Sequence, residues 1–378
     1  MKKIFLWREK PVDVDIGLWN LIAASGNFEI IELYQEQLLA ERSQTGIGSG
    51  DFVKNFKSMC VNFKEDRKKL AELIDADSIN IFYGFNETLI YYQKLIKKRK
   101  FKFVVIAESP KFMKGKWVYA IKNFLLKFKY LFLSKRFNDT ISLFFAYGND
   151  GVQNYKKVGF CDSVLKPIMY NSENQTVKYH SDAIKAPLKL VYVGRFDYKY
   201  KGLDILINAS KNFDKSEILL DLVGGYGKDT QRVLSSISPY LNINYIGSWN
   251  QSDVVKRMSA YDICIVPSRC DGWNINVNHA IKAGIACIAT NTSTSYELLR
   301  YSKSGCIVDP SVDAIKNVFK FAIDHPKQVL QWKHNASVYA PLISVAKMAD
   351  YMLTCFKALT DNNKKRDSID PYWQKEYD

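Results

Sequence analysis

The stretch Val266-Pro-Ser-Arg-Cys-Asp-Gly-Trp-Asn-Ile-Asn-Val-Asn-His-Ala-Ile-Lys-Ala-Gly284 decides how the chain is interpreted. The apolar run at 262–266 predicts a buried strand, and the polar turn after it leads into a short helix that ends at Gly284. In an open parallel sheet, such a strand-to-helix turn faces the crevice where ligands bind. The carboxylate of Asp271 and the N–H groups of the helix N-terminus therefore suit a sugar hydroxyl beside a phosphate.

The composition predicts a folded protein of two domains with a basic surface. The chain has 378 residues, of which 47% are hydrophobic and 14% aromatic, and this excludes a disordered chain. The net charge of +15 predicts attraction to nucleic acid, anionic lipid headgroups or phosphorylated substrates. The seven cysteines show neither a CxxC pair nor metal-ligand spacing, so we expect reduced thiols in a cytoplasmic protein.

No stretch of the sequence predicts a membrane-spanning helix. The first ten residues contain an apolar run of only four residues, which is too short for a signal peptide and predicts a first strand. No uncharged apolar run approaches the roughly 20 residues that cross a bilayer. We therefore expect a soluble or peripheral protein.

Strand-like and helix-like patterns alternate along the chain, most clearly in its second half. This alternation predicts parallel βαβ units, and the near-continuous apolar character of the strands predicts a sheet covered on both faces. In the second half the strand-like runs are 188–194, 218–224, 243–247, 262–266, 286–290 and 306–308.

The linker and the domains follow from the same pattern. Residues 170–187 are polar and lack periodicity, which predicts a linker. We expect a first domain over residues 1–170 together with the C-terminal tail at 346–378, and a second domain over 171–345. The last helix, at about 344–359, is expected to cross back to the first domain, and the glycine-rich segment 44–51 is expected to be a loop.

A pair of cations follows the predicted strand at 188–194. In Val193-Gly-Arg-Phe-Asp-Tyr-Lys-Tyr-Lys-Gly-Leu-Asp204, a helix opens after the strand, and Arg195 and Lys201 are expected to face the crevice. Two fixed cations stabilise the negative charge that grows on a leaving nucleotide diphosphate. Lys199 competes with Lys201 for this role, and the alternative is a solvated basic loop before an ordinary helix.

Three further segments of the second half supply candidate donor-binding residues. Glycines after the strand at 218–224 permit close approach of the backbone to a nucleotide. N–H groups at the helix N-terminus after Asp271 suit a phosphate, and a histidine in that helix suits a ribose. The structural alternatives are a plain turn, a helix cap, a core histidine and a favourable first-turn carboxylate. These candidates are Gly224, Gly225, Trp273, Asn274, His279, Thr294 and Glu297.

In this order and spacing, the motifs between residues 188 and 310 resemble glycosyltransferase family 4, a retaining family with the GT-B fold. The resemblance implies an α/β protein with two Rossmann-like parallel-sheet domains that face a cleft. It further implies that Arg195 and Lys201 hold the diphosphate of the donor, without a metal or a cofactor. The family has two glutamates eight positions apart, and Asp271 and His279 occupy those positions here. Asn274 stands where the family commonly has glycine.

The function implied is the retaining transfer of a hexose from a nucleotide sugar to a hydroxyl of a glycan. The acceptor is expected to be lipid-linked, as in the assembly of surface polysaccharide, lipopolysaccharide O-antigen or capsule. Glu108, after the strand-like run at 103–107, is expected to position the acceptor hydroxyl, and the alternative is a solvated loop carboxylate. The rival functions are a nucleic-acid-binding protein, a catalytically weak nucleotide-sugar-binding homologue and a nucleotide-sugar epimerase. We expect no nucleic-acid partner.

From Lys94 to Arg136 the chain carries many basic residues and a single acid, Glu108. Within this region an apolar stripe, flanked by lysines, recurs at helical spacing. It predicts a helix that lies in the interface of an anionic membrane. We therefore expect a bacterial protein that is cytoplasmic or bound peripherally to the inner face of the plasma membrane. The alternative is a stripe that faces the protein core. The stripe consists of Trp117, Ile121, Phe124, Leu125, Phe128, Leu131 and Phe132.

Overall fold

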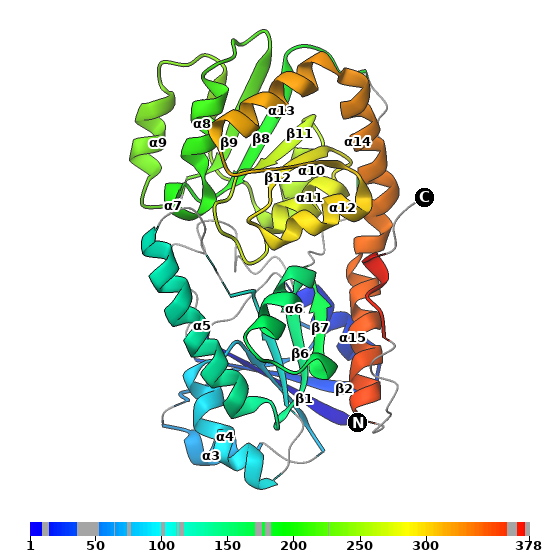
Figure 1. Ribbon diagram of the computed structural model, residues 1–378. Coiled ribbons are helices and arrows are strands. Elements are labelled where there is room, and N and C mark those ends of the chain that lie inside the picture. Colours follow the sequence, from blue (N-terminus) through cyan, green and yellow to red (C-terminus); the bar gives the residue numbers. More distant parts are fainter. Residues whose placement is uncertain are drawn as a thin grey trace. The chain divides into compact units, whose positions relative to one another are not determined.

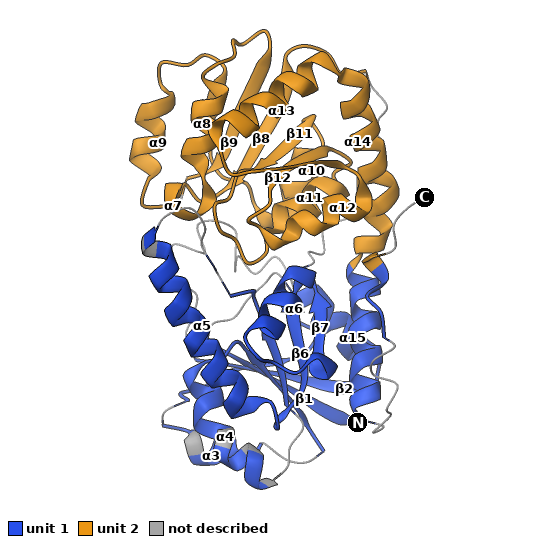
Figure 2. Ribbon diagram, viewed as in Figure 1, with its two compact units in different colours: residues 1–43, 48–172, 345–372 blue, residues 44–47, 173–344, 373–378 orange. Residues whose placement is uncertain are grey.

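The computed structural model places the chain in two compact units (Figure 2). The first comprises residues 1–43, 48–172 and 345–372, and the second comprises 44–47, 173–344 and 373–378. The predicted loop at 44–51 and most of the predicted linker lie outside the described residues. The structure describes residues 1–9, 15–35, 53–63, 65–73, 77–99, 103–110, 112, 117–170, 176–177, 183–225, 227–360 and 369–374.

The first unit is built on a seven-stranded sheet in the order β3-β2-β1-β4-β5-β6-β7, in which each strand runs parallel to its neighbours (Figure 1). The central strands form from apolar runs that are buried along almost their whole length. The strands are β1 (Lys2–Arg8), β2 (Phe28–Tyr34), β3 (Lys57–Cys60), β4 (Ile79–Tyr83), β5 (Phe103–Ala107), β6 (Ile141–Tyr147) and β7 (Leu165–Ile168).

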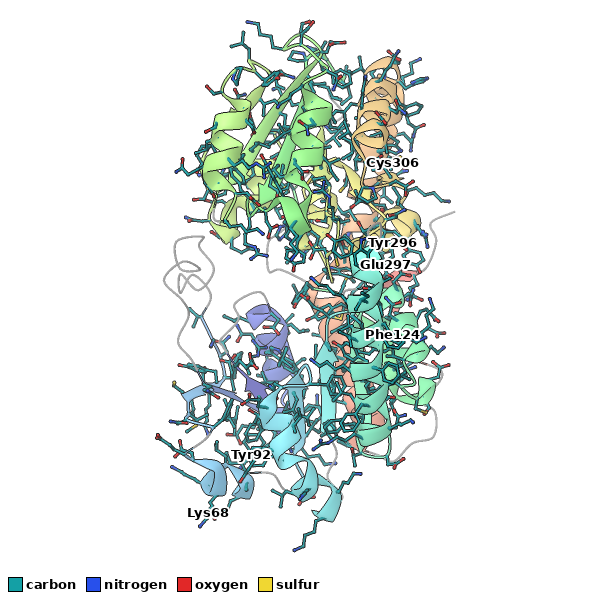
Figure 3. All side chains as sticks on the ribbon, turned by 60° about the vertical axis from the view of Figure 1, so that its left-hand side comes forward. Lys68, Tyr92, Phe124, Tyr296, Glu297 and Cys306 are labelled. Carbon is teal, nitrogen blue, oxygen red and sulfur yellow. The ribbon has the colours of Figure 1, made fainter. Side chains whose placement is uncertain are left out.

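Aromatic rings fill much of the core of this unit. Trp7 stacks on Phe82 with ring centroids 5.5 Å apart and also packs against Tyr92, which is labelled in Figure 3. Such ring pairs stabilise the unit beyond the apolar area that they bury. The helices are α1 (Ile16–Ala24), α3 (Arg67–Glu72), α4 (Glu87–Arg99), α5 (Trp117–Phe137), α6 (Gly148–Lys157) and α15 (Val345–Thr360).

Helix α15 belongs to the first unit, as the sequence predicted for the last helix, although it lies near the end of the chain. It packs against α1, and the buried ring of Phe356 holds it there. The centroid of this ring lies 6.4 Å from that of Trp19 and 6.0 Å from those of Phe28 and Phe145. Helix α15 is therefore packed into the core of the first unit.

The second unit has a six-stranded sheet in the order β10-β9-β8-β11-β12-β13, again with parallel neighbours. Branched aliphatic side chains dominate its core. The strands are β8 (Leu188–Gly194), β9 (Ile218–Gly224), β10 (Ile243–Tyr245), β11 (Ile263–Val266), β12 (Ala286–Thr290) and β13 (Gly305–Val308). The helices are α7 (Tyr198–Lys201), α8 (Leu203–Ser210), α9 (Thr230–Ile237), α10 (Val254–Met258), α11 (Ile275–Lys282), α12 (Glu297–Ser302), α13 (Val312–Asp324) and α14 (Pro326–Tyr339).

Both sheets reverse their strand order beside their first strand. The reversal falls between β1 and β4 in the first unit and between β8 and β11 in the second. In open α/β sheets, ligands bind outside the carboxyl ends of the strands at this switch point. The topology therefore directs attention to the residues that follow β8 and β11.

The attachment of α15 can be tested with Phe356→Ala. Loss of this buried ring is expected to lower the free energy of unfolding by about 3–5 kcal/mol, because a cavity opens between α15, α1 and the sheet. Urea denaturation followed by circular dichroism measures the change. Phe124→Ala, which removes a ring that is 60% exposed, is the matched control and is expected to stay within about 0.5 kcal/mol of the wild type. Equal losses in both variants would contradict this packing.

Candidate functional site

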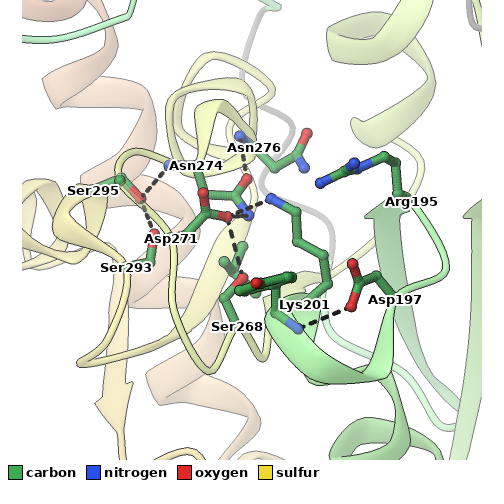
Figure 4. Close-up of polar contacts among 12 residues, drawn as sticks. Arg195, Asp197, Lys201, Ser268, Asp271, Asn274, Asn276, Ser293 and Ser295 are labelled. Atoms are coloured by element: carbon green, nitrogen blue, oxygen red, sulfur yellow. Dashed lines mark hydrogen bonds and ion pairs between the residues drawn. The ribbon is translucent and has the colours of Figure 1, made fainter. Parts of the chain in front are cut away.

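An ion pair lies at the switch point of the second sheet (Figure 4). Lys201 Nζ donates to Asp271 Oδ2 at 2.5 Å, and the two side chains are 20% and 10% exposed. Lys201 ends α7, after β8, and Asp271 lies in the loop after β11. The same carboxylate oxygen accepts from Asn274 Nδ2 at 3.1 Å and from Ser268 Oγ at 3.4 Å. The fold thus brings together two of the residues that the sequence singled out.

Local backbone features place Lys201. Asp197 caps α7 by accepting from the Tyr200 N–H at 2.9 Å, and Gly202 ends the helix in the left-handed conformation with φ of 64°. A Cβ atom at Gly202 would lie 2.0 Å from the Pro267 carbonyl oxygen. Glycine is therefore the residue that lets α7 end directly against the loop that carries Asp271.

Arg269 joins the same two segments from the side of the loop. Its guanidinium donates two hydrogen bonds to Asp204, at 2.5 and 2.7 Å, and its backbone N–H donates to the Tyr200 carbonyl at 2.8 Å. Paired guanidinium–carboxylate bonds of this kind fix geometry as well as energy. The sequence analysis did not select Arg269. The only sign in the sequence was that it lies two residues before Asp271.

Arg195 follows β8 directly and is exposed. Figure 4 shows its side chain on the same side as the Lys201–Asp271 pair. The Tyr192 hydroxyl donates to the Arg195 carbonyl at 2.7 Å, and Asn276 Nδ2 donates to the Val193 carbonyl at 2.7 Å. These bonds tie the backbone beside Arg195 to its own strand and to the start of α11.

The N-terminus of α11 is capped by the protein itself. Asn274 is the N-cap and accepts from the Asn276 N–H at 3.1 Å, while its own N–H donates to Ser295 Oγ at 3.3 Å. Trp273 is buried, and its indole N–H donates to Asn278 Oδ1 at 3.0 Å. The capping alternative for Asn274 is thus observed, and its predicted contact with a phosphate stays a prediction.

The segment after β12 completes this side of the site. Thr294, in the 3-10 helix η3 (Thr294–Tyr296), donates through its hydroxyl to the Gly272 carbonyl, and Asp271 forms an isolated bridge with Ser293. Glu297 is buried at the start of α12 and is labelled in Figure 3. The segment after β12 therefore supports the loop after β11, which in turn contacts the end of α7. The predicted contact of Glu297 with a ribose stays a prediction.

Gly224, the last residue of β9, and Gly225 after it lie where a side chain would be crowded. Gly224 and Gly225 have φ angles of 129° and 119°. A Cβ atom at Gly224 would lie 2.0 Å from the Gly194 carbonyl oxygen, and one at Gly225 would lie 2.8 Å from the Tyr245 hydroxyl. Close packing of β8 against β9 is enough to require glycine at the first position, whatever ligand lies nearby.

His279 lies in the core, where it is 1% exposed. Burial lowers its pKa from 6.5 to about 3, and the charge of Lys282 contributes in the same direction. Burial also lowers the pKa of Lys282 to about 8. The imidazole is therefore neutral at physiological pH, and its predicted contact with a ribose is not tested by this structure.

In the first unit, Glu108 follows β5. The Tyr170 hydroxyl donates to Glu108 Oε1 at 3.5 Å, and the Tyr155 hydroxyl donates to the Glu108 carbonyl at 2.7 Å. The rings of Tyr147 and Tyr170 stack with centroids 4.0 Å apart. Glu108 thus lies beside tyrosines at the carboxyl ends of the strands, and its role toward an acceptor stays a prediction.

A charged cluster that the sequence did not reveal lies at the switch point of the first sheet. Arg8, the last residue of β1, donates to Asp15 Oδ2 at 2.6 Å and to the Tyr83 hydroxyl at 2.5 Å, and pairs with Glu32 at 3.3 Å. Arg8 and Glu32 are 2% and 1% exposed. The one sign of this cluster in the sequence was an arginine, Arg8, at the carboxyl end of an apolar strand. The pairing compensates the burial of these charges.

The structure also bears on metals and membranes. Among the described residues, no group of three or more His, Cys, Asp or Glu side chains is arranged to hold a metal ion. The same part of the chain contains no helix that is long and apolar enough to span a bilayer.

Comparison with known proteins finds relatives of this chain. Residues 176–338 match the model of the family described as glycosyl transferases group 1. An uncharacterized 41.2 kDa protein of the cps region of Klebsiella pneumoniae is 23% identical over 248 residues, which are 60% of this chain. An uncharacterized glycosyltransferase of Methanocaldococcus jannaschii is 27% identical over 181 residues, 44% of this chain. The matches span 63% and 45% of the lengths of these relatives.

Solved structures identify the fold. The Anabaena protein HepE, in complex with UDP, has a TM-score of 0.73 at 12% identity, and the match covers 95% of this chain and 100% of that protein. The same protein has also been solved with UDP-glucose, at a TM-score of 0.71 and again 12% identity. The predicted α/β fold of the GT-B type, with two parallel sheets, is confirmed.

The role of Gly202 can be tested with Gly202→Ala. The variant is expected to lose at least about 2 kcal/mol of unfolding free energy, because alanine is disfavoured in the left-handed region and its Cβ meets the Pro267 carbonyl. Gly151→Ala in α6 is the control, since its Cβ meets neighbours only at 3.5 Å or more. Urea denaturation of both variants gives the comparison. A Gly202→Ala protein as stable as the control would contradict the required close approach.

The neutral state of His279 makes stability depend on pH. As the pH falls below 6.5, the unfolded chain binds a proton at this position before the folded chain does, so the folded state loses stability down to about pH 3. Between pH 7 and pH 5 this amounts to about 2 kcal/mol. His279→Gln is expected to remove that part of the loss, as urea denaturation at both pH values would show. An unchanged pH dependence in the variant would contradict the burial of a neutral ring.

Proposed function

We propose that this protein transfers a sugar from a nucleotide-sugar donor to a hydroxyl of a glycan during the assembly of a surface polysaccharide. The observation that carries the proposal is the Lys201–Asp271 pair beside Arg195 at the switch point of the second sheet. The family of residues 176–338 and the nucleotide complexes of HepE support the nucleotide-sugar donor. The cps-region relative supports a role in polysaccharide assembly.

The chemistry of the pair suits a diphosphate and its sugar. Arg195 and Lys201 would bind the diphosphate and stabilise the charge that grows on it as the glycosidic bond breaks. Asp271, whose position the Lys201 ammonium and the Asn274 amide fix, would accept hydrogen bonds from the hydroxyls of the transferred hexose. Binding sugar and leaving group on neighbouring loops of one rigid sheet also fixes their mutual orientation.

Retention at the anomeric carbon forms part of this proposal. A carboxylate that already accepts bonds from Lys201 and Asn274 is better suited to positioning a substrate than to attacking it as a nucleophile. Catalysis would then rest on orientation and on stabilisation of the leaving group, with the acceptor hydroxyl positioned by Glu108 in the first unit. No metal or cofactor takes part in this scheme, and a lipid-linked glycan is the proposed acceptor.

The cation pair can be tested with Arg195→Ala and Lys201→Ala. Each variant is expected to reduce turnover by at least about 100-fold, the scale seen when one charge-stabilising donor is lost. A thermal-shift screen of nucleoside diphosphate sugars selects the donor, and release of the nucleoside diphosphate measures turnover. Lys199→Ala is the matched control, because Lys199 is exposed and lies over the Tyr200 ring, not beside Asp271.

Two outcomes would contradict the proposal in different ways. Near-normal turnover in both alanine variants would show that Arg195 and Lys201 do not stabilise the leaving diphosphate. A wild-type protein that binds a nucleotide sugar yet never transfers or hydrolyses it would instead be a binding homologue without turnover.

A further inference from the structure

Helix α5 presents a row of large apolar side chains to solvent. Their exposed fractions range from 54% for Ile121 to 77% for Trp117. At about 100° per residue, they cover an arc of about 100° on the helix surface. Figure 3 labels Phe124 as one of the side chains on this helix. We call these residues the α5 stripe: Trp117, Ile121, Phe124, Leu125, Phe128 and Phe132.

The opposite side of the same helix attaches it to the first unit. Leu133 and Phe137 are buried in the hydrophobic core, and Tyr130 packs against Phe85 with ring centroids 6.3 Å apart. The alternative in which the stripe faces the core is therefore wrong. The helix has two apolar faces, of which one is satisfied within the unit, and an exposed apolar patch of this kind marks an interaction site.

Basic residues border the α5 stripe. On a helix with about 100° per residue, Lys122, Lys129 and Arg136 follow one edge of the stripe, Lys127 lies beyond the other edge, and Lys135 lies within the arc in the last turn. The sequence of α5 contains no aspartate or glutamate. The apolar arc is thus framed by positive charge on a chain whose net charge is +15.

We propose that the α5 stripe docks on an anionic lipid membrane. The stripe would enter the boundary between headgroups and acyl chains, while the long lysine side chains reach the phosphates beside it. A second copy of this chain fits the surface less well, since a two-fold contact would bring lysines together without an acid on α5 to pair with them. A nucleic acid would favour cations among stacking rings, whereas this arc includes the aliphatic Ile121 and Leu125.

The proposal is independent of sugar transfer, so its test does not use enzymatic activity. The full chain is mixed with vesicles of phosphatidylcholine alone or of phosphatidylcholine with phosphatidylglycerol, and co-sedimentation measures binding. We expect binding to the phosphatidylglycerol vesicles, weaker binding at high salt and little binding to phosphatidylcholine alone. Failure to bind the anionic vesicles at low salt would overturn the proposal, whatever the outcome of the turnover assays.

Two pairs of substitutions assign the binding to α5. Phe124→Ser with Phe128→Ser removes apolar contact, and the pair is expected to weaken binding by about tenfold or more. Lys122→Gln with Lys127→Gln is expected to weaken it by about fivefold for each lysine. All four side chains are exposed, so the thermal midpoint should stay near that of the wild type.

Matched controls lie on the second unit. Leu241→Ser changes another exposed apolar residue, and Lys316→Gln with Lys320→Gln changes two exposed lysines of α13. These variants are expected to bind vesicles like the wild type, and equal losses in them would overturn the assignment to α5. Sedimentation equilibrium and titration with single-stranded RNA cover the other occupants. The proposal would also be overturned if the wild type formed a dimer or an RNA complex but did not bind vesicles. In that case, loss of the dimer or the RNA complex on Phe124→Ser with Phe128→Ser would assign the α5 stripe to that other partner.

Discussion

The contact between Lys201 and Asp271 joins the end of α7 to the loop after β11, the two segments that form the candidate site of the second unit. The residues are 70 positions apart, and their 2.5 Å contact exists only because β8 and β11 are neighbours in the sheet. Two further contacts hold the same segments together: the close approach of Gly202 to Pro267, and the hydrogen bonds from Arg269 to Asp204. A cation fixed in this way needs little reorganisation when an anionic group arrives, which is how preorganised charge lowers a barrier.

The second sheet could be predicted from the sequence because its strands β11 and β12 are continuous apolar runs buried along their whole length, and β8 and β9 are mostly apolar. The first sheet was harder. Its edge strand β3 (Lys57–Cys60) is exposed along its whole length and has no apolar pattern, so backbone pairing with β2 creates it and composition gives no sign of it. The Arg8 cluster escaped for a related reason. Arg8 and Tyr83 are 75 positions apart, and only the pairing of β1 with β4 brings them together.

The departures from the family pattern have physical consequences in the structure. His279 occupies a position where the family has glutamate, and the structure buries it almost completely. A carboxylate there would require a compensating charge or hydrogen bonds, whereas a neutral imidazole costs much less to bury. Asn274 uses its side chain to cap α11, a task that glycine lacks the side chain to perform. Asn274 thus has a structural role that is separate from any ligand, whereas burial accounts for the neutral state of His279 and not for the choice of histidine.

Helix α5 shows why a periodic pattern fixes a face but not its surroundings. The spacing of the apolar residues predicted the helix and its stripe, and a stripe on the core side would have read the same in the sequence. A second apolar set, with Leu133 and Phe137, is the one that packs into the core. A helix needs only one buried face to stay attached to its sheet. The other face can therefore stay apolar for a different reason, and the lysines beside it carry the charge that the proposed anionic membrane would attract.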